Sequence, residues 1–277
     1  MTGIAFIKMH GLGNDFVVVD GRAAALALDP GWVRAVADRR TGVGCDQLIA
    51  ILPSEVADAR MVIRNADGRP AEACGNGSRC VAALLMAENG SDRARIETDA
   101  GIIDARAGDG GAITVDMGAP RCDWRGVPLA READTLHLDL GAAAPEPAVA
   151  LNTGVPHAVF FVDDVAAIDV AAIGAALERH PIFPDAANID FAQVLAPDRI
   201  RMRVWERGAG VTRACGTGAC AVAVAAARRG LCGRAVRVVL DGGALDILWR
   251  DDDHIEMTGP AATAFEGRLS STLGGAS

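Results

Sequence analysis

The first half of the chain is a succession of short apolar stretches, each enriched in β-branched side chains and set between polar residues. This pattern is typical of strands, because β-branched residues fit a pleated, partly buried surface. The predicted strands are Ile4–Met9, Val17–Asp20, Gln47–Leu52, Arg60–Arg64, Ala94–Thr98, Ile102–Arg106 and Ala112–Met117.

Three segments have helical character instead. A helix over Pro30–Arg40 begins with proline and has Asp29 before it as an N-cap. A second helix over Ser78–Glu88 stops at Gly90, and a third covers Gly218–Arg229. The second and third are apolar on nearly all faces, so each is expected to lie buried within its part of the fold.

The chain carries an internal repeat built on two cysteine loops, Ala73–Gly77 and Ala214–Gly218, which lie 141 residues apart. The loops read Ala-Cys-Gly-Asn-Gly and Ala-Cys-Gly-Thr-Gly. At the same offset two pairs of polar residues correspond, namely Asn65 with Glu206 and Gln47 with Asn188.

A further correspondence lies near the start of each copy. Val17–Asp20 resembles Phe160–Asp163 at an offset two residues longer, which sets Asn14 against His157. Several correspondences at a nearly constant offset indicate that the two halves are copies of one domain.

Each copy has the length of a typical domain. We therefore expect an α+β fold of two pseudo-symmetric, strand-rich, barrel-like domains, each wrapped around a central buried helix. The N-terminal half is predicted to cover residues 1–120, with the tail 263–277 packing back on it. The C-terminal half is predicted to cover residues 121–262.

Composition and charge narrow the choice of partners. A net charge of -9 argues against a nucleic-acid partner, and no basic run points to a membrane surface. The first residues lack the features of a signal peptide, and no apolar run is long enough to span a membrane. We therefore expect a soluble, cytoplasmic protein, in which the seven cysteines are free thiols.

Cys74 and Cys215 each precede a Gly-x-Gly turn that opens a helix. A helix N-terminus carries partial positive charge, so it is expected to lower the pKa of each thiol and to bind a carboxylate. If the two halves face each other, one thiolate can remove an α-proton while the other thiol protonates the opposite face. This chemistry needs no cofactor, and the sequence shows no motif of a pyridoxal enzyme.

Two other kinds of site are weighed against this chemistry. A zinc-binding interaction module would use Cys74 with Cys80 and Cys215 with Cys220, but these spacings are long and no histidine lies nearby. A dithiol redox protein would need a Cys-x-x-Cys pair, which the chain lacks. The other five cysteines are interpreted as small core residues, namely Cys45, Cys80, Cys122, Cys220 and Cys232.

The sequence resembles the diaminopimelate epimerase family over its whole length, and six motifs carry the resemblance. They are Lys8–Phe16, Gly42–Gln47, Arg64–Gly68, Ala73–Gly77, Trp205–Gly208 and Ala214–Gly218. The resemblance implies a two-domain fold with the active site in the cleft, and a homodimer. It also implies interconversion of LL- and meso-2,6-diaminopimelate, which supplies lysine biosynthesis and, in most bacteria, peptidoglycan synthesis.

The resemblance also implies which residues act. Cys74 and Cys215 match the catalytic pair, and His157 matches a histidine beside the site. The substrate-binding positions matched are Asn14, Gln47, Asn65, Gly75, Asn76, Asn188, Glu206, Arg207, Gly216 and Thr217. One departure is Val155, which stands where many relatives have an asparagine that contacts substrate, and Asn152 is a possible substitute.

The main alternative is an enzyme of the same fold that acts on another amino acid, such as proline, hydroxyproline or histidine. Proline-type substrates are compact rings and need no site for a distal charge. The set of Asn65, Asn188 and Arg207 favours a long zwitterion, because a guanidinium can pair with a distal carboxylate. A phenazine-type isomerase is disfavoured because both cysteines are present.

Overall fold

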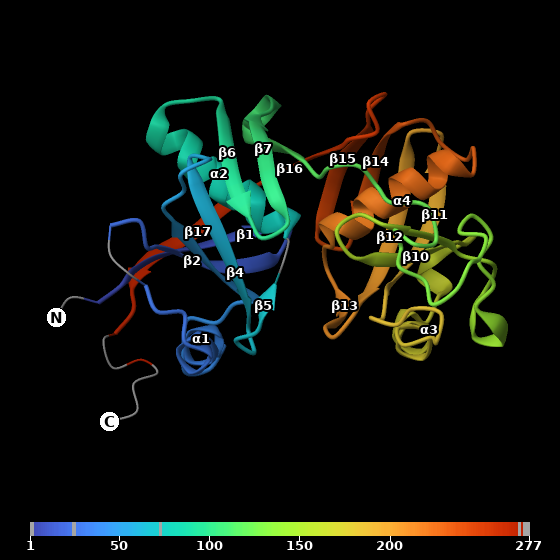
Figure 1. Ribbon diagram of the computed structural model, residues 1–277, viewed down its shortest axis with the longest axis horizontal. Coiled ribbons are helices and arrows are strands. Elements are labelled where there is room, and N and C mark those ends of the chain that lie inside the picture. The colour runs from blue at the N-terminus through green and yellow to red at the C-terminus, as the bar shows by residue number, and fades with distance from the viewer. Residues whose placement is uncertain (1–2, 24–25, 72–73, 271–272, 274–277) are drawn as a thin grey trace. The chain divides into compact units, whose positions relative to one another are not determined.

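A computed structural model describes residues 3–23, 26–71, 74–270 and 273. The contacts within the chain divide it into two units. The first consists of Met1–Val115 together with Gly259–Ser277, and the second of Asp116–Thr258. Each unit is a curved sheet that packs around one helix (Figure 1).

In the first unit, neighbouring strands follow the order β17-β1-β2-β3-β4-β6-β7-β8, and β5 pairs with β4. The β2/β3 and β4/β6 pairs are parallel and the others are antiparallel. The strands are β1 (Ala5–Gly11), β2 (Asn14–Asp20), β3 (Gln47–Leu52), β4 (Ala59–Asn65), β5 (Pro70–Ala71), β6 (Arg93–Thr98), β7 (Gly101–Ala107), β8 (Ile113–Asp116) and β17 (Ala262–Arg268).

The second unit repeats this topology, with the order β9-β10-β11-β12-β14-β15-β16 and β13 on β12. Its parallel pairs, β10/β11 and β12/β14, occupy the corresponding places. The strands are β9 (Val149–Asn152), β10 (Pro156–Phe161), β11 (Asn188–Ala196), β12 (Arg199–Glu206), β13 (Gly210–Thr212), β14 (Ala235–Leu240), β15 (Gly243–Trp249) and β16 (Ile255–Gly259). The predicted α+β class and the predicted duplication are confirmed.

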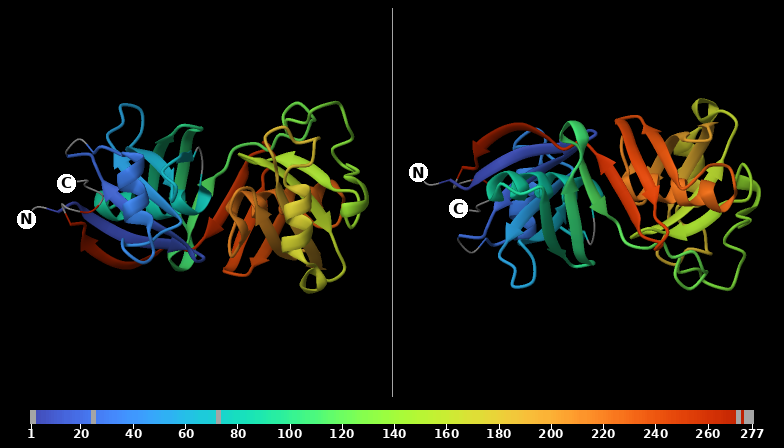
Figure 2. Two further views of the ribbon diagram at one scale, coloured as in Figure 1. Left: turned by 90° about the horizontal axis from the view of Figure 1, so that it is seen from below. Right: turned by 90° about the horizontal axis from the view of Figure 1, so that it is seen from above.

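The helices also correspond between the units. They are α1 (Pro30–Ala37) and α2 (Gly75–Asn89) in the first, and α3 (Val170–Leu177) and α4 (Gly216–Arg228) in the second, with short 3-10 turns at Asp109–Gly111, Gly141–Ala143 and Val165–Ala167. Helix α2 contacts β1, β2, β6 and β7, whereas α4 contacts β9 to β12, β14 and β15 (Figures 1 and 2). In the part of the chain that the structure describes, no helix is long and apolar enough to cross a membrane.

Both central helices are buried because they offer almost no polar face. Every residue from Ala219 to Ala226 is buried against the surrounding strands. In α2, burial extends without a break from Gly75 to Ala82 and includes the charged Arg79. A helix that is apolar all round is stable only inside a core, which explains why the sheets wrap around these two.

The predicted helices exist, but their ends differ. Helix α1 has the expected Asp29 cap and stops at Ala37 rather than Arg40, because Asp38 takes an extended conformation. Helices α2 and α4 begin earlier than predicted, at Gly75 and Gly216. Helix α3 was not predicted from the sequence.

The register of the parallel strand pairs corrects one predicted correspondence. Phe16 lies beside Gln47 in the first unit, and His157 lies beside Asn188 in the second. Because Gln47 and Asn188 are equivalent, the residue equivalent to His157 is Phe16, not Asn14. The offset of 141 residues therefore holds here too, and the apparent two-residue shift was wrong.

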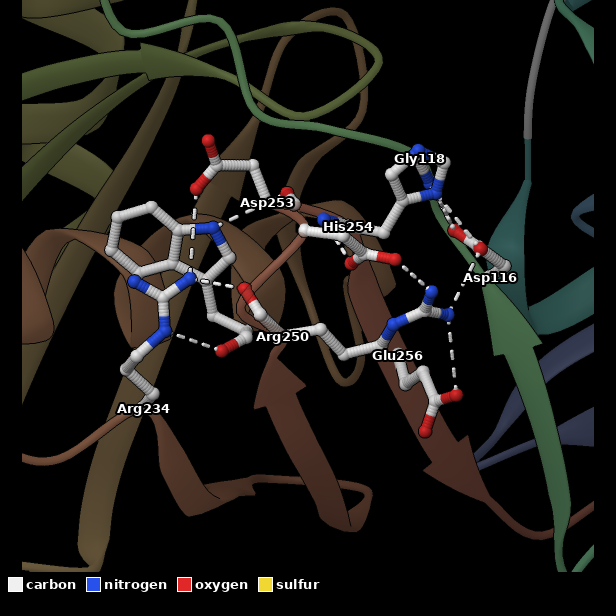
Figure 3. Close-up of polar contacts among 9 residues, drawn as sticks. Asp116, Gly118, Arg234, Arg250, Asp253, His254 and Glu256 are labelled. Atoms are coloured by element: carbon white, nitrogen blue, oxygen red, sulfur yellow. Dashed lines mark hydrogen bonds and ion pairs between the residues drawn. The ribbon is translucent and has the colours of Figure 1, made fainter.

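A polar cluster joins the first and last residues of the second unit (Figure 3). The Asp116 carboxylate lies 2.9 Å from His254 Nδ1 and 3.5 Å from an Arg250 nitrogen. Ile255 N–H donates to the Gly118 carbonyl at 3.0 Å, and Met117 N–H donates to the Ile255 carbonyl at 2.8 Å. Because the charged groups are partly exposed, their pairing adds little stability beyond that of the backbone bonds.

We expect Gly174→Ala to lower the free energy of unfolding, as judged by urea denaturation. An added Cβ would lie 2.4 Å from Trp205 Cβ, so α3 would have to move away from β12. Overpacking of this kind costs about 1–3 kcal/mol, which exceeds the gain of about 1 kcal/mol from alanine in a helix. Gly233→Ala is the control, because nothing lies within 4 Å of its added Cβ. Equal stability of the two variants would contradict the packing described.

Candidate functional site

Cys74 is the N-cap of α2, and its sulfur completes the first turn of the helix. The residue has an extended backbone, with φ -152° and ψ 100°, and its Sγ accepts the Gly77 N–H at 3.3 Å. A Cβ at position 77 would lie 2.7 Å from Ile49 Cδ1 and 3.5 Å from Cys74 Sγ. A larger residue at this position would therefore require the buried Ile49 side chain to move.

A series of amides surrounds the Cys74 sulfur. Asn14 Oδ1 accepts a hydrogen bond from Asn76 Nδ2 at 3.1 Å and lies 3.7 Å from Cys74 Sγ. The Arg79 guanidinium donates to Asn76 Oδ1 at 2.8 Å. Arg79 is fully buried, and its Nε also reaches the Pro260 carbonyl at 3.3 Å. The orientation of the Asn76 amide is therefore set from the interior of the unit.

The other predicted polar residues of the first unit lie on adjacent strands. Asn14 Nδ2 donates to Asp46 Oδ2 at 2.9 Å, and Gln47 Nε2 donates to Asn65 Oδ1 at 3.0 Å. Gln47 Oε1 is buried and has no hydrogen-bond partner among the described residues. This oxygen can therefore accept a further hydrogen bond. Sequence reasoning missed Arg79 and Asp46, whose roles depend on contacts distant in the chain.

Cys215 caps α4 in the same way. Its Sγ accepts the Gly218 N–H at 3.3 Å and lies 3.4 Å from the Thr217 hydroxyl. A Cβ at Gly218 would lie 2.7 Å from Asp190 Oδ1, in the place that Ile49 occupies in the first unit. The two cysteine loops are thus alike in conformation and differ in what packs beneath them.

The predicted residues of the second unit surround Cys215. Asn188 Nδ2 lies 3.9 Å from the sulfur, and its Oδ1 accepts the Arg207 N–H at 2.9 Å. The Thr212 hydroxyl hydrogen-bonds the Glu206 carboxylate. The Arg207 side chain is exposed, and its guanidinium donates one hydrogen bond to the Asp185 carbonyl at 2.8 Å. The guanidinium has further N–H donors that a ligand can use.

His157 pairs with an acid that sequence reasoning missed. Its Nδ1 lies 2.7 Å from Asp190 Oδ2, and both side chains are fully buried. The Asn152 amide, the possible substitute for the contact expected at Val155, is hydrogen-bonded at both ends within its own unit. Its Nδ2 donates to the Gly126 carbonyl at 3.2 Å, and its Oδ1 accepts the Gly154 N–H at 2.9 Å.

The expectation that the helix end lowers the pKa of Cys215 is wrong for this structure. Burial, together with the nearby charges of Glu206 and Asp190, raises the pKa of Cys215 well above its usual value. The Thr217 hydroxyl and the Gly218 N–H act in the opposite direction but do not outweigh these effects. Burial also raises the pKa of Glu206, against hydrogen bonds from Thr212 and Cys215 and the charge of His157. Cys215 is therefore a thiol at neutral pH.

The remaining cysteines are not equivalent. Cys45 and Cys80 are buried, and burial raises the pKa of Cys45 to about 11 and that of Cys80 to about 12. Cys220 is buried as well. Cys122 and Cys232 are only partly buried, so the prediction that they are core residues is wrong. Among the described residues, no group of three or more His, Cys, Asp or Glu could hold a metal ion.

Comparisons with known proteins agree on one family. The family model described as diaminopimelate epimerase matches residues 6–122 and 149–264. A diaminopimelate epimerase of Rhodospirillum centenum is 55% identical, covering 97% of this chain and 93% of the relative. The corresponding protein of Phenylobacterium zucineum is 54% identical, covering 96% of this chain and 98% of the relative.

The fold is also similar to solved structures of more distant proteins. The structure of a probable proline racemase from Agrobacterium radiobacter superposes on this one with a TM-score of 0.70. The superposition covers 98% of this chain and 96% of the racemase chain. Its sequence identity is 17%, so the likeness bears on the fold alone.

We expect Glu206→Gln to make Cys215 react with iodoacetamide at a lower pH. A thiol with a raised pKa is protonated at neutral pH and reacts only as the pH climbs toward that value. Removing the neighbouring negative charge lowers the pKa of Cys215, so the rise in rate moves to lower pH. The measurement is mass-spectrometric mapping of the Cys215 peptide after timed alkylation across neutral and alkaline pH. Glu132→Gln, an exposed residue of the same unit, should leave the profile unchanged.

Proposed function

We propose that this chain, which belongs to the diaminopimelate epimerase family, interconverts LL- and meso-2,6-diaminopimelate without a cofactor. The observation that carries this proposal is that a cysteine sulfur caps a buried helix in each unit, Cys74 on α2 and Cys215 on α4. The enzyme is an isomerase, and the reaction belongs to lysine biosynthesis.

In the proposed reaction, the two thiols act on opposite faces of one α-carbon. One thiolate accepts the α-proton, and the electron pair of the broken C–H bond delocalises into the adjacent carboxylate. The other thiol then donates its proton to the opposite face, so the carbon is inverted and each sulfur ends in the other's starting state. The raised pKa of Cys215 supports its role as the thiol of the free enzyme.

The reacting carboxylate is proposed to bind the N–H groups at the two helix starts. These are the groups of Gly75 and Asn76 on α2 and of Gly216 and Thr217 on α4. The first N–H groups of a helix have no acceptor within it, and the helix dipole favours an anion there. Charge that develops on the carboxylate is therefore stabilised where it forms.

The rest of the substrate is proposed to bind the polar residues near each cysteine. The exposed Arg207 suits the distal carboxylate, since a guanidinium can pair with it in a bidentate manner. Glu206 suits an ammonium group. Amides from both units fix the orientation of the substrate, namely Asn14, Gln47, Asn65 and Asn188.

A homodimeric assembly is proposed from the family resemblance alone. A location in the cytoplasm is proposed from the sequence expectation given above.

The first test of the proposal is exchange of the substrate α-proton in heavy water. The parent protein should exchange it with diaminopimelate and not with proline or histidine. Cys74→Ala and Cys215→Ala should each lose at least about 10²-fold in the rate of epimerisation, because each removes one of the two proton-transfer groups that inversion needs. Cys80→Ala and Cys220→Ala remove buried thiols from the same two helices and should stay active. Retention of more than a few per cent of the rate by either Cys74→Ala or Cys215→Ala contradicts the two-thiol mechanism.

Substrate choice is tested at Arg207. Arg207→Met should raise KM for diaminopimelate on the order of 30-fold or more, since loss of a charge-assisted pair costs about 2–3 kcal/mol. Steady-state kinetics measure this, with Arg179→Met as an exposed control in the same unit. An unchanged KM would mean that Arg207 does not bind the distal carboxylate. Exchange with proline or histidine would then identify the substrate instead.

A further inference from the structure

One place in the fold is apolar in the first unit and polar in the second. Ile49 pairs with Val18 on the neighbouring strand, just as Asp190 pairs with Val159. Ile49 therefore corresponds to Asp190, as Phe16 corresponds to His157. A Phe–Ile pair in the first unit is replaced by a His–Asp pair in the second. All four of these side chains are fully buried. The fold can therefore be built at this place without polar groups.

The polar pair is costly where it stands. His157 Nε2 and Asp190 Oδ1 are buried and have no hydrogen-bond partner among the described residues. A buried polar atom without a partner costs about 1–3 kcal/mol, and the apolar pair of the first unit avoids this cost. Packing therefore does not account for the His–Asp pair.

The pair borders the Cys215 half of the site. Asp190 Oδ1 lies beneath the first turn of α4, where a Cβ on Gly218 would come within 2.7 Å of it. The charge of Asp190 acts on Cys215, and the charge of His157 acts on Glu206. The charged and titratable groups around the imidazole thus include Asp190, Glu206 and Cys215.

We propose that Asp190 is a positioning residue, whose carboxylate accepts a hydrogen bond from Nδ1 of His157 and so leaves Nε2 as the ring nitrogen without a hydrogen. An ionised carboxylate only accepts hydrogen bonds, so Nδ1 at 2.7 Å must be the donor. The opposite tautomer needs a protonated Asp190 and leaves an N–H at Nε2 buried without an acceptor. The hydrogen bond made by one ring nitrogen thus decides the state of the other. This role deepens the proposed epimerase function and rests on it.

The tautomer is measured directly by ¹⁵N NMR of histidine side chains in the substrate-free protein. The chain has five histidines, so His157→Gln assigns the signals. We expect the neutral ring of His157 to carry its hydrogen on Nδ1 and none on Nε2. A neutral form with hydrogen on Nε2 and a bare Nδ1 would overturn the proposal. The measurement needs no activity, so it stands even if the protein fails to epimerise diaminopimelate.

Asp190→Asn links the tautomer to turnover. The variant keeps the shape of the side chain and loses its charge, so we expect a mixed His157 tautomer, a kcat lower by at least about tenfold, and a KM nearly unchanged. Asp134→Asn is the control, because it removes the carboxylate from the exposed pair with His137, where the two groups lie 3.2 Å apart. An Asp190→Asn variant with parental kcat and an altered tautomer would show that the tautomer does not matter, and this too overturns the proposal.

A double variant separates this role from a structural one. His157→Phe with Asp190→Ile installs the pair that the first unit already contains. We expect this protein to keep its thermal unfolding temperature and to lose at least as much of kcat as Asp190→Asn, because it has no imidazole at all. If the double variant instead unfolds at a lower temperature, and this instability accounts for its lost activity, then the role of the His–Asp pair is structural and the proposal is overturned.

Discussion

The start of a buried helix is the constraint on which each half of this molecule depends. The first N–H groups of a helix have no acceptor within it, and in a core they cannot turn to water. In both units a cysteine sulfur accepts one of them at 3.3 Å, from Gly77 in α2 and from Gly218 in α4. The proposed catalytic atoms are thus also helix caps, so the fold itself fixes where each sulfur lies.

The two units place different charges around the same scaffold. Beneath the Cys74 loop lies Ile49, and a buried guanidinium from Arg79 orients the amide of Asn76. In the second unit the position equivalent to Arg79 is Cys220, and Asp190 takes the place of Ile49. The surroundings of Cys215 are therefore the more negative of the two, which together with burial keeps its proton on the sulfur.

Local pattern was sufficient to predict the main strands of the first half and the cysteine loops, because each depends on residues close together in the chain. The duplication was predictable because the two loops and several polar residues recur at one nearly constant offset. The strand over Gln47–Leu52 was predicted to the residue. Helix α3 was missed because its eight residues are short and interrupted by Gly174, which makes room for Trp205. The burial of Arg79 was not predictable, since its Nε partner is a carbonyl 181 residues away. The predicted direction of the pKa shift of Cys215 was wrong, because burial, together with the charges of Glu206 and Asp190, outweighs the effect of its own helix end.

A duplicated fold gives a two-thiol epimerase two equivalent positions, but the proposed reaction needs the two sulfurs in different protonation states. Identical surroundings would leave the proton equally on either sulfur, and half of the free enzyme would then be unable to accept a given diastereomer of the substrate. Replacing Asn65 by Glu206 and Ile49 by Asp190 removes this degeneracy without changing the backbone of the loops. The bias cannot alter the equilibrium between LL and meso substrate, because a catalyst lowers the barrier equally in both directions. It can only set which form of the free enzyme is populated, and so which of the two diastereomers finds the enzyme in the protonation state that it needs.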